Sequence, residues 1–182
     1  FLFIRVLKAG EDRRFREVKK KFSGFLVWWT ISALWVFLTT VNALVTIINN
    51  VEYYDDLFLF IGLIIWIAGF SFEVIADEQK RKFRLQSSNK DQFISNGLWS
   101  ISRHPNYFGE ILLWIGMAII AYPTLIGWQH LSLISPVFIY LLITKMSGVN
   151  LLENHADKKW GEDENYKKYK QNTPVLIPFL KT

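Results

Sequence analysis

The chain is organised around the stretch GLWSISRHPNYFGE, residues 97–110, which runs directly into the apolar segment 111–128. This stretch places an arginine, a histidine, an asparagine, a tyrosine and a glutamate at the mouth of a membrane-length helix. Polar and ionisable groups are expensive at that depth, so they indicate a functional site whose members have internal partners. Pro105 disfavours helix at His104 and suits the first positions of a helix, which predicts a helix start at Pro105 or Asn106.

Hydropathy divides the chain into four apolar segments. Residues 22–48 contain no charge and are long enough to span a bilayer. Residues 57–72, 111–128 and 131–144 are also charge-free, but each is shorter than the roughly 20 residues of a span and must extend into its flanks. The second segment continues through residues 73–84 without Gly or Pro, so one helix is expected to leave the bilayer there. The pattern predicts an all-α, polytopic integral membrane protein with about four transmembrane helices.

The distribution of basic residues predicts the topology. All 21 lysines and arginines fall within residues 5–21, 80–103 and 145–181, whereas the loop 49–56 and the turn 129–130 have none. With four spans, the three basic stretches lie on one side, as the positive-inside rule requires. We therefore expect a single membrane domain over residues 1–182, with both termini on the cytosolic-equivalent side and residues 145–182 as a tail on that side. The pattern fits the endoplasmic reticulum, the mitochondrial inner membrane or a bacterial inner membrane equally well.

Composition excludes several kinds of site and partner. The chain has no cysteine and three scattered histidines, which excludes disulfides and thiolate metal sites and makes a histidine metal cluster unexpected. The net charge of +5 comes with no nucleic-acid motif, and membrane lipids with anionic headgroups account for it. The chain begins at Phe1 rather than Met, from which we expect a protein that extends upstream.

Three groups of polar and aromatic residues are predicted to meet at the basic membrane face. They offer arginines and helix N-terminal amides for phosphates, carboxylates for ribose hydroxyls and aromatic faces for a base. This inventory suits a nucleotide-bearing cofactor, and because no Gly-rich Rossmann or Walker motif is present, the site would be of neither type. The groups are the helical stripe Glu73, Asp77, Arg81 and Arg84, the turn Arg103 to Tyr107 with Glu110, and the tail residues Glu153, Trp160, Tyr166 and Tyr169.

Each of these residues also has a purely structural interpretation. The stripe can be a run of intrahelical ion pairs, each worth a few tenths of a kcal/mol. Arg84 and Arg103 can be membrane-side anchors, Asn106 an N-cap, and the tyrosines packing residues. Glu110 is harder to explain in this way, because a carboxylate one turn into a membrane helix requires a partner.

Several motifs in the same order resemble the steroid 5-alpha-reductase-like membrane reductases, most closely the DUF1295 branch, over nearly the whole chain. The motifs are GEDRRF at 10–15, ExxxDxQKxxF at 73–83, GLWxxSRHPNYFGE at 97–110 and SGVxLLE at 147–153. The resemblance implies a helical membrane fold of about seven spans, with NADPH bound among the cytosolic ends of the later helices.

The resemblance also implies site roles and a reaction. Asp77, Arg81 and Arg84 look like ribose and phosphate contacts, and Asn106 and Glu110 look like contacts to the nicotinamide end. The implied reaction transfers a hydride to the beta carbon of an enone in a steroid, sterol or other lipid-like substrate and a proton to the alpha carbon. The acid and tyrosine that polarise the carbonyl in such reductases are expected upstream of Phe1. The remaining wall of the cofactor site would include Arg103, His104, Tyr107, Glu153, Tyr166 and Tyr169.

Two other functions compete with an NADPH-dependent reductase. The first is a catalytically silent structural or accessory subunit of a membrane complex, which a start beyond the catalytic helices favours. The second is an S-adenosylmethionine-dependent methyltransferase of the isoprenylcysteine carboxyl methyltransferase kind. Those enzymes look similar around RHPxYxG, which residues 103–109 match, but they typically carry paired glutamates in the tail, whereas the segment Leu152-Glu153-Asn154 of this chain has one.

Overall fold

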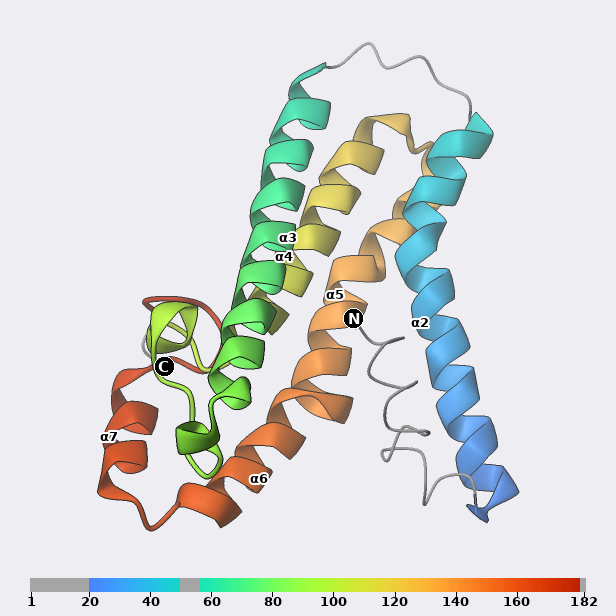
Figure 1. Ribbon diagram of the computed structural model, residues 1–182. Coiled ribbons are helices and arrows are strands. Elements are labelled where there is room, and N and C mark those ends of the chain that lie inside the picture. The colour runs from blue at the N-terminus through green and yellow to red at the C-terminus, as the bar shows by residue number, and fades with distance from the viewer. Residues whose placement is uncertain (1–19, 50–55, 181–182) are drawn as a thin grey trace. The chain divides into compact units, whose positions relative to one another are not determined.

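The computed structural model describes residues 20–49 and 56–180, and these residues contain helices and no strand (Figure 1). The predictions that fall on residues 1–19, 50–55 and 181–182 lie outside the described part. The α-helices are α2 (Phe22–Asn49), α3 (Asp56–Leu85), α4 (Pro105–Ala121), α5 (Ser135–Leu141), α6 (Val149–Trp160) and α7 (Glu164–Asn172).

Four helical stretches are long and apolar enough to cross a membrane: Phe22–Asn49, Leu57–Leu85, Pro105–Thr124 and Gly127–Trp160. The predicted all-α, four-span membrane architecture is therefore confirmed. The fourth stretch is not one regular helix, since it includes 3-10 turns over Gly127–Ile134 and a π-helical turn over Leu142–Ser147. The side on which each terminus lies stays a prediction.

The helix boundaries follow the sequence signals. α3 continues unbroken through the charged residues to Leu85, as the absence of Gly and Pro predicts. α4 begins at Pro105, whose fixed φ suits the first helical position. His104 before it has non-helical backbone angles, with φ at −137° and ψ at 61°. The interpretation of Asn106 as an N-cap is wrong, because His104 occupies the N-cap position and Asn106 lies inside the first turn.

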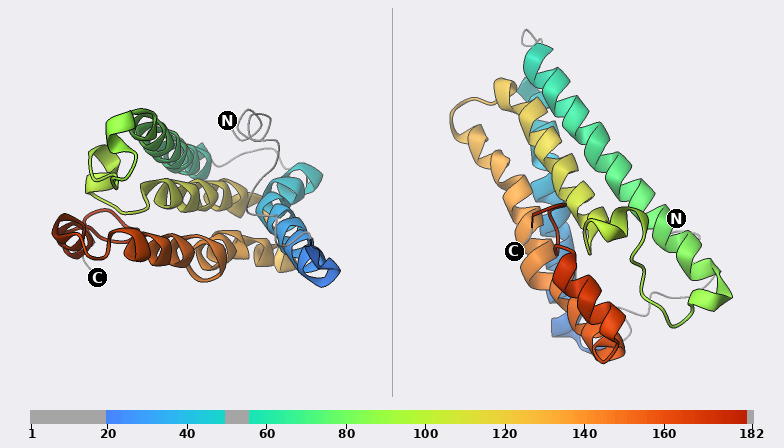
Figure 2. Two further views of the ribbon diagram at one scale, coloured as in Figure 1. Left: turned by 60° about the horizontal axis from the view of Figure 1, so that its bottom comes forward. Right: turned by 90° about the vertical axis from the view of Figure 1, so that its left-hand side faces the viewer.

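α3 and α4 lie side by side (Figures 1 and 2), and their backbones approach closely where glycines face the neighbouring helix. A Cβ added to Gly109 would lie 2.6 Å from both the Glu73 amide nitrogen and the Gly69 carbonyl oxygen. A Cβ added to Gly116 would lie 2.7 Å from the Gly62 carbonyl oxygen. Small residues at such interfaces let membrane helices approach. This contact fixes the charged end of α3 against the start of α4.

Contacts divide the chain into two compact units, residues 1–38 and 39–182. The described part of the first unit is residues 20–38, mostly the first part of α2. In the second unit, polar bonds tie the end of α2 to the connection after α4: Asn42 Nδ2 donates to Ser135 Oγ (3.4 Å), and Asn49 Nδ2 donates to the Thr124 carbonyl (2.7 Å). The site described below lies wholly within the second unit.

Candidate functional site

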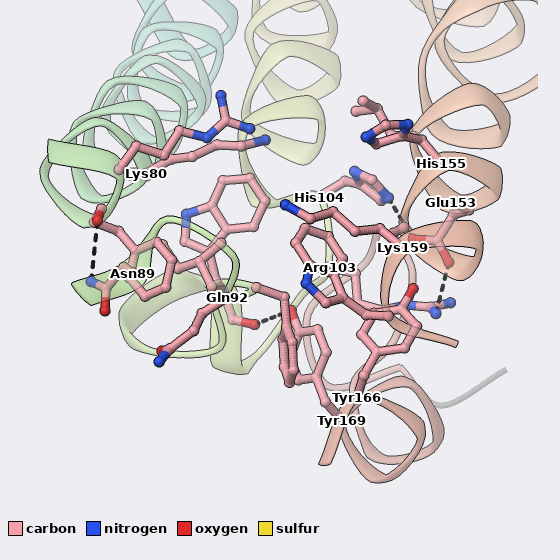
Figure 3. Close-up of a pocket in the computed structure, with 18 of the residues that line it drawn as sticks. Lys80, Asn89, Gln92, Arg103, His104, Glu153, His155, Lys159, Tyr166 and Tyr169 are labelled. Atoms are coloured by element: carbon pink, nitrogen blue, oxygen red, sulfur yellow. Dashed lines mark hydrogen bonds and ion pairs between the residues drawn. The ribbon is translucent and has the colours of Figure 1, made fainter. Parts of the chain in front are cut away.

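A cavity of about 470 Å³ lies at the end of α3, within the size range of small-molecule and cofactor sites (Figure 3). Its walls come from four parts of the chain that are distant in sequence. These are the last turns of α3 (80–84), the segment 89–94, the turn 99–104, and helices α6 and α7 (152–169).

Positive charge dominates the cavity wall. Five lining side chains are lysine or arginine, and one is a carboxylate. Arg103 Nη1 lies 2.8 Å from Glu153 Oε2, and Lys159 Nζ lies 3.3 Å from Asp91 Oδ1. The other three cations have no carboxylate oxygen within 4.0 Å among the residues that the structure describes. A cavity of this sign attracts an anionic ligand. The unpaired cations are Lys80, Arg84 and Lys90.

Lys80 rests on an aromatic platform instead of a carboxylate. Its Nζ lies 4.5 Å from the centroid of the Trp99 ring, within the range of cation–π attraction. Trp99 is buried, and its indole Nε1 donates to the Ala76 carbonyl of α3 (3.0 Å). Its own carbonyl accepts a hydrogen bond from the Tyr169 hydroxyl (2.6 Å). The platform is therefore held by both α3 and α7.

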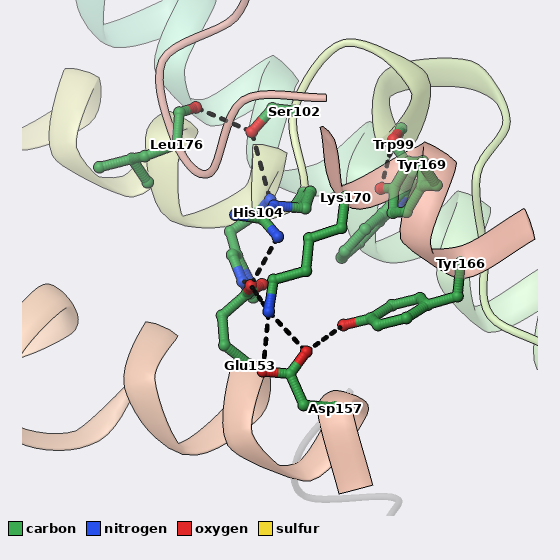
Figure 4. Close-up of polar contacts among 10 residues, drawn as sticks. Trp99, Ser102, His104, Glu153, Asp157, Tyr166, Tyr169, Lys170 and Leu176 are labelled. Atoms are coloured by element: carbon green, nitrogen blue, oxygen red, sulfur yellow. Dashed lines mark hydrogen bonds and ion pairs between the residues drawn. The ribbon is translucent and has the colours of Figure 1, made fainter. Parts of the chain in front are cut away.

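Glu153 of α6 joins the turn before α4 to the tail (Figure 4). Its Oε2 contacts Arg103, and its Oε1 lies 2.8 Å from His104 Nε2. Lys170 of α7 lies 4.0 Å from the same carboxylate and bonds both oxygens of Asp157 more closely. The side chains of Arg103 and His104 are only 9% and 7% exposed. The Glu153 carboxylate thus contacts both buried side chains of the turn.

Three buried polar atoms of the turn have no hydrogen bond among the described residues: Arg103 Nε, Arg103 Nη1 and His104 Nδ1. Of these, Nη1 still lies within ion-pair distance of Glu153. Buried polar groups are usually hydrogen-bonded, and each exception requires an explanation. Both residues line the cavity. A polar ligand in the cavity is the explanation that their position favours.

Aromatic side chains form the wall opposite α3. The Phe93 ring packs against Tyr166 (5.3 Å between centroids) and Tyr169 (5.4 Å). Burial raises the pKa of both tyrosine hydroxyls, because it disfavours the phenolate. Tyr166 therefore stays a neutral donor, to Asp157 Oδ1 (3.1 Å), as Tyr169 does to Trp99.

The segment after α7 is fastened to the turn before α4. The Arg103 amide donates to the Pro174 carbonyl (2.9 Å), and Ser102 Oγ donates to the Leu176 carbonyl (2.8 Å; Figure 4). These two hydrogen bonds hold the backbone after α7 against the backbone of the turn before α4.

Comparison with known proteins identifies the family of the chain. The family described as "Protein of unknown function (DUF1295)" matches residues 1–173. The chain belongs to the DUF1295 family. It is also 30% identical over 128 residues to 3-oxo-5-alpha-steroid 4-dehydrogenase 1 of Macaca fascicularis, a match that covers 69% of this chain. The match covers 42% of that relative, so the chain spans less than half of the relative's length. No solved structure matches. The predicted steroid 5-alpha-reductase-like family is confirmed.

The structure of this DUF1295 protein brings together only some of the predicted site residues. Arg81 does not line the cavity, because its guanidinium forms two bonds to Glu78 (2.6 and 2.7 Å) at the exposed side of α3. Tyr107 stacks on His104 and packs against the core residues around Ile139. The predicted residues that line the cavity are Arg84, Arg103, His104, Glu153, Trp160, Tyr166 and Tyr169.

The remaining predicted residues of the DUF1295 protein form a second polar group between α3 and α4. Asn106 and Glu110 both lie close enough to Asp77 to interact with it, and Glu110 also interacts electrostatically with Glu73. Residues of the predicted α3 stripe and the start of α4 therefore lie side by side. No set of three His, Asp or Glu residues in the described ranges is arranged to hold a metal ion.

Sequence reasoning missed several lining residues. Lys80 lies four residues before Arg84, so the helical period could have placed both on one face. The others lie on loops or on α6, and no spacing in the sequence links them to the site. These residues are Lys90, Phe93, Trp99, His155 and Lys159.

Proposed function

We propose that this protein binds NADPH in the cavity and acts as a reductase of an enone double bond in a steroid or other lipid. The observation that carries the proposal is the group of unpaired cations, Lys80, Arg84 and Lys90, opposite an aromatic wall. Charge-assisted bonds from lysine and arginine are the strong means of holding phosphates, and aromatic faces suit a base.

The residues present fit such a ligand. Arg103 Nε and His104 Nδ1 are buried, lack partners among the described residues, and belong to side chains that line the cavity. A buried unsatisfied group costs about 1–3 kcal/mol, so a ligand that supplies a polar atom to either of them regains that energy. Lys80, Arg84 and Lys90 would hold the phosphates. When bound, NADPH supplies the hydride for the beta carbon of the enone.

The chain's own residues would bind and orient the cofactor. Asn106 and Glu110, on the first turns of α4, are proposed to contact the nicotinamide end, with Asp77 holding the Asn106 amide in place. Tyr166 and Tyr169, with Phe93, would close the opposite wall against water. The groups that polarise the substrate carbonyl are proposed to come from outside this chain segment.

The charge of the cavity favours a dinucleotide over S-adenosylmethionine. The latter carries a cationic sulfonium and no phosphate, so three unpaired cations would oppose its binding. A structural or accessory subunit remains the alternative for a chain that retains the fold but binds no cofactor.

Titration calorimetry on the full-length protein in detergent tests the proposal. We expect NADPH to bind and S-adenosylmethionine to give no heat. Arg84→Ala should weaken NADPH binding about 10- to 100-fold, since it removes a charge-assisted bond to phosphate. Arg81→Ala is the matched control on the same helix and should bind as the wild type does, because Arg81 faces Glu78. Absence of NADPH binding, or equal losses in both variants, would contradict the proposal.

A further inference from the structure

The part of the chain that the structure describes closes with residues 174–180, which contain no polar side chain. They follow the polar helix α7, yet three of their apolar side chains are exposed. Phe179 is 81% exposed, Leu180 55% and Ile177 47%. Exposed apolar side chains that gather in one place mark an interaction site or a membrane contact. The terminal segment, residues 177–180, therefore calls for an apolar partner outside the described residues.

Hydrogen bonds fasten the residues before the terminal segment to the start of a membrane span. The Arg103 amide donates to the Pro174 carbonyl (2.9 Å), and Ser102 Oγ donates to the Leu176 carbonyl (2.8 Å). Both donors closely precede Pro105, at which the third membrane-length stretch begins. Since a span begins at the membrane boundary, residues 174–176 lie at the level of that boundary.

The side chain between these two hydrogen bonds packs against a membrane helix. Val175 contacts the buried cluster of Ile139, Ile143 and Val149. This cluster belongs to the fourth membrane-length stretch, Gly127–Trp160. The terminal segment therefore starts beside the spans and not at a distance from them.

The backbone of the terminal segment is strained. Phe179 has a φ of 66°, which bulky residues rarely adopt. The Leu180 amide donates to the Ile177 carbonyl (3.2 Å) and closes the turn around Phe179. Strain of this kind persists only where the surroundings determine the conformation. Because most of Phe179 is exposed, the described residues supply little of that stabilisation, and an apolar environment outside them would supply the rest.

The charge beside the terminal segment favours a lipid surface as its partner. Residues 80–103, which end at the turn before α4, contain six lysines and arginines and one carboxylate. Basic stretches next to a span attract anionic headgroups. An apolar turn beside such a stretch combines the two forces that hold interfacial segments in a membrane.

We propose that Ile177, Phe179 and Leu180 form an interfacial anchor, which inserts at the boundary between the headgroups and the acyl chains of the membrane that α4 enters. The anchor follows α7, whose Tyr166 and Tyr169 line the cavity. It thereby holds this wall of the cavity at the membrane surface. The proposal rests on the position of the terminal segment and does not depend on which ligand the cavity binds.

Spin labels test the anchor in the full-length protein, because the chain contains no cysteine of its own. Leu180→Cys carries the label in nanodiscs of phosphatidylcholine and phosphatidylglycerol, and electron paramagnetic resonance measures its collisions with oxygen and with a water-soluble nickel chelate. Phe70→Cys, on the apolar part of α3, is the lipid reference, and Lys168→Cys, on the exposed side of α7, is the water reference. We expect the label at position 180 to collide more with oxygen than with the nickel chelate, as the lipid reference does.

A second substitution, Phe179→Asn in the Leu180→Cys background, tests the contribution of the ring. Asparagine tolerates a positive φ, so the turn can keep its backbone while it loses the ring. The label at position 180 should then lose its excess of oxygen collisions, whereas Lys168→Asn should leave that excess unchanged. Three results would overturn the proposal: a label at position 180 that matches the water reference, one that the protein shields from both reagents, or one that Phe179→Asn leaves unchanged.

Discussion

Replacing Glu153 with glutamine removes the carboxylate that contacts both Arg103 and His104 in the buried turn before α4. Glu153 contacts Arg103 and His104 at 2.8 Å each, and the Arg103 side chain is only 9% exposed. In Glu153→Gln, the amide oxygen can accept one hydrogen bond, but the guanidinium loses its negative partner. Breaking a buried ion pair in this way typically costs about 3–5 kcal/mol.

The cost in this protein should lie below that range. The Glu153 side chain is 18% exposed, so water screens the pair in part, and glutamine keeps one of the bonds. We expect a loss of about 2–3 kcal/mol in the free energy of unfolding. For a chain of this size, such a loss lowers the Tm by about 4–12 °C.

Thermal unfolding of the detergent-solubilised protein, followed by circular dichroism at the helix band, measures this effect. Glu164→Gln is the matched control, because Glu164 pairs with Lys167 at 2.7 Å on the exposed face of α7 and should leave the Tm unchanged. If Glu153→Gln and Glu164→Gln unfold at the same temperature, Glu153 does not balance the buried turn and the reasoning is refuted.

Two further substitutions test the helix contact and the aromatic platform. Gly109→Ala should lower the free energy of unfolding by about 1–3 kcal/mol, because the added Cβ would meet backbone atoms of α3, which cannot rotate away. An unchanged Tm would show that the two helices are not in backbone contact. Tyr169→Phe removes the 2.6 Å hydrogen bond to the Trp99 carbonyl. This should lower the free energy of unfolding by about 1 kcal/mol and weaken NADPH binding. An unaltered calorimetric affinity for NADPH would show that the position of Trp99 does not depend on this bond.

The fold could largely be predicted because its signals are local. Uncharged segments of sufficient length predict the spans, and Pro105 predicts the start of α4. Gly109 and Gly116 indicate that another backbone approaches α4. Their partners, Gly62 and Gly69, could not be predicted, since the period of a single helix does not say which neighbour it meets.

The sequence predicts where the site lies better than it predicts which residues line it. The spacing of the stripe puts Arg81 and Arg84 on one face, but a local bond to Glu78 turns Arg81 outward, while Arg84 lines the cavity. Lys80 gains its position from Trp99, which is far from it in sequence. Such roles depend on tertiary contacts, so helical spacing alone could neither exclude Arg81 nor select Lys80.

The central claim, that the cavity binds NADPH, is tested most directly by native mass spectrometry of the full-length protein extracted in detergent with whatever co-purifies. The account predicts a mass increment of one NADPH per chain, which is lost in Arg84→Ala and kept in Arg81→Ala. A chain that carries no nucleotide even after addition of NADPH, or one that carries S-adenosylmethionine, would contradict it.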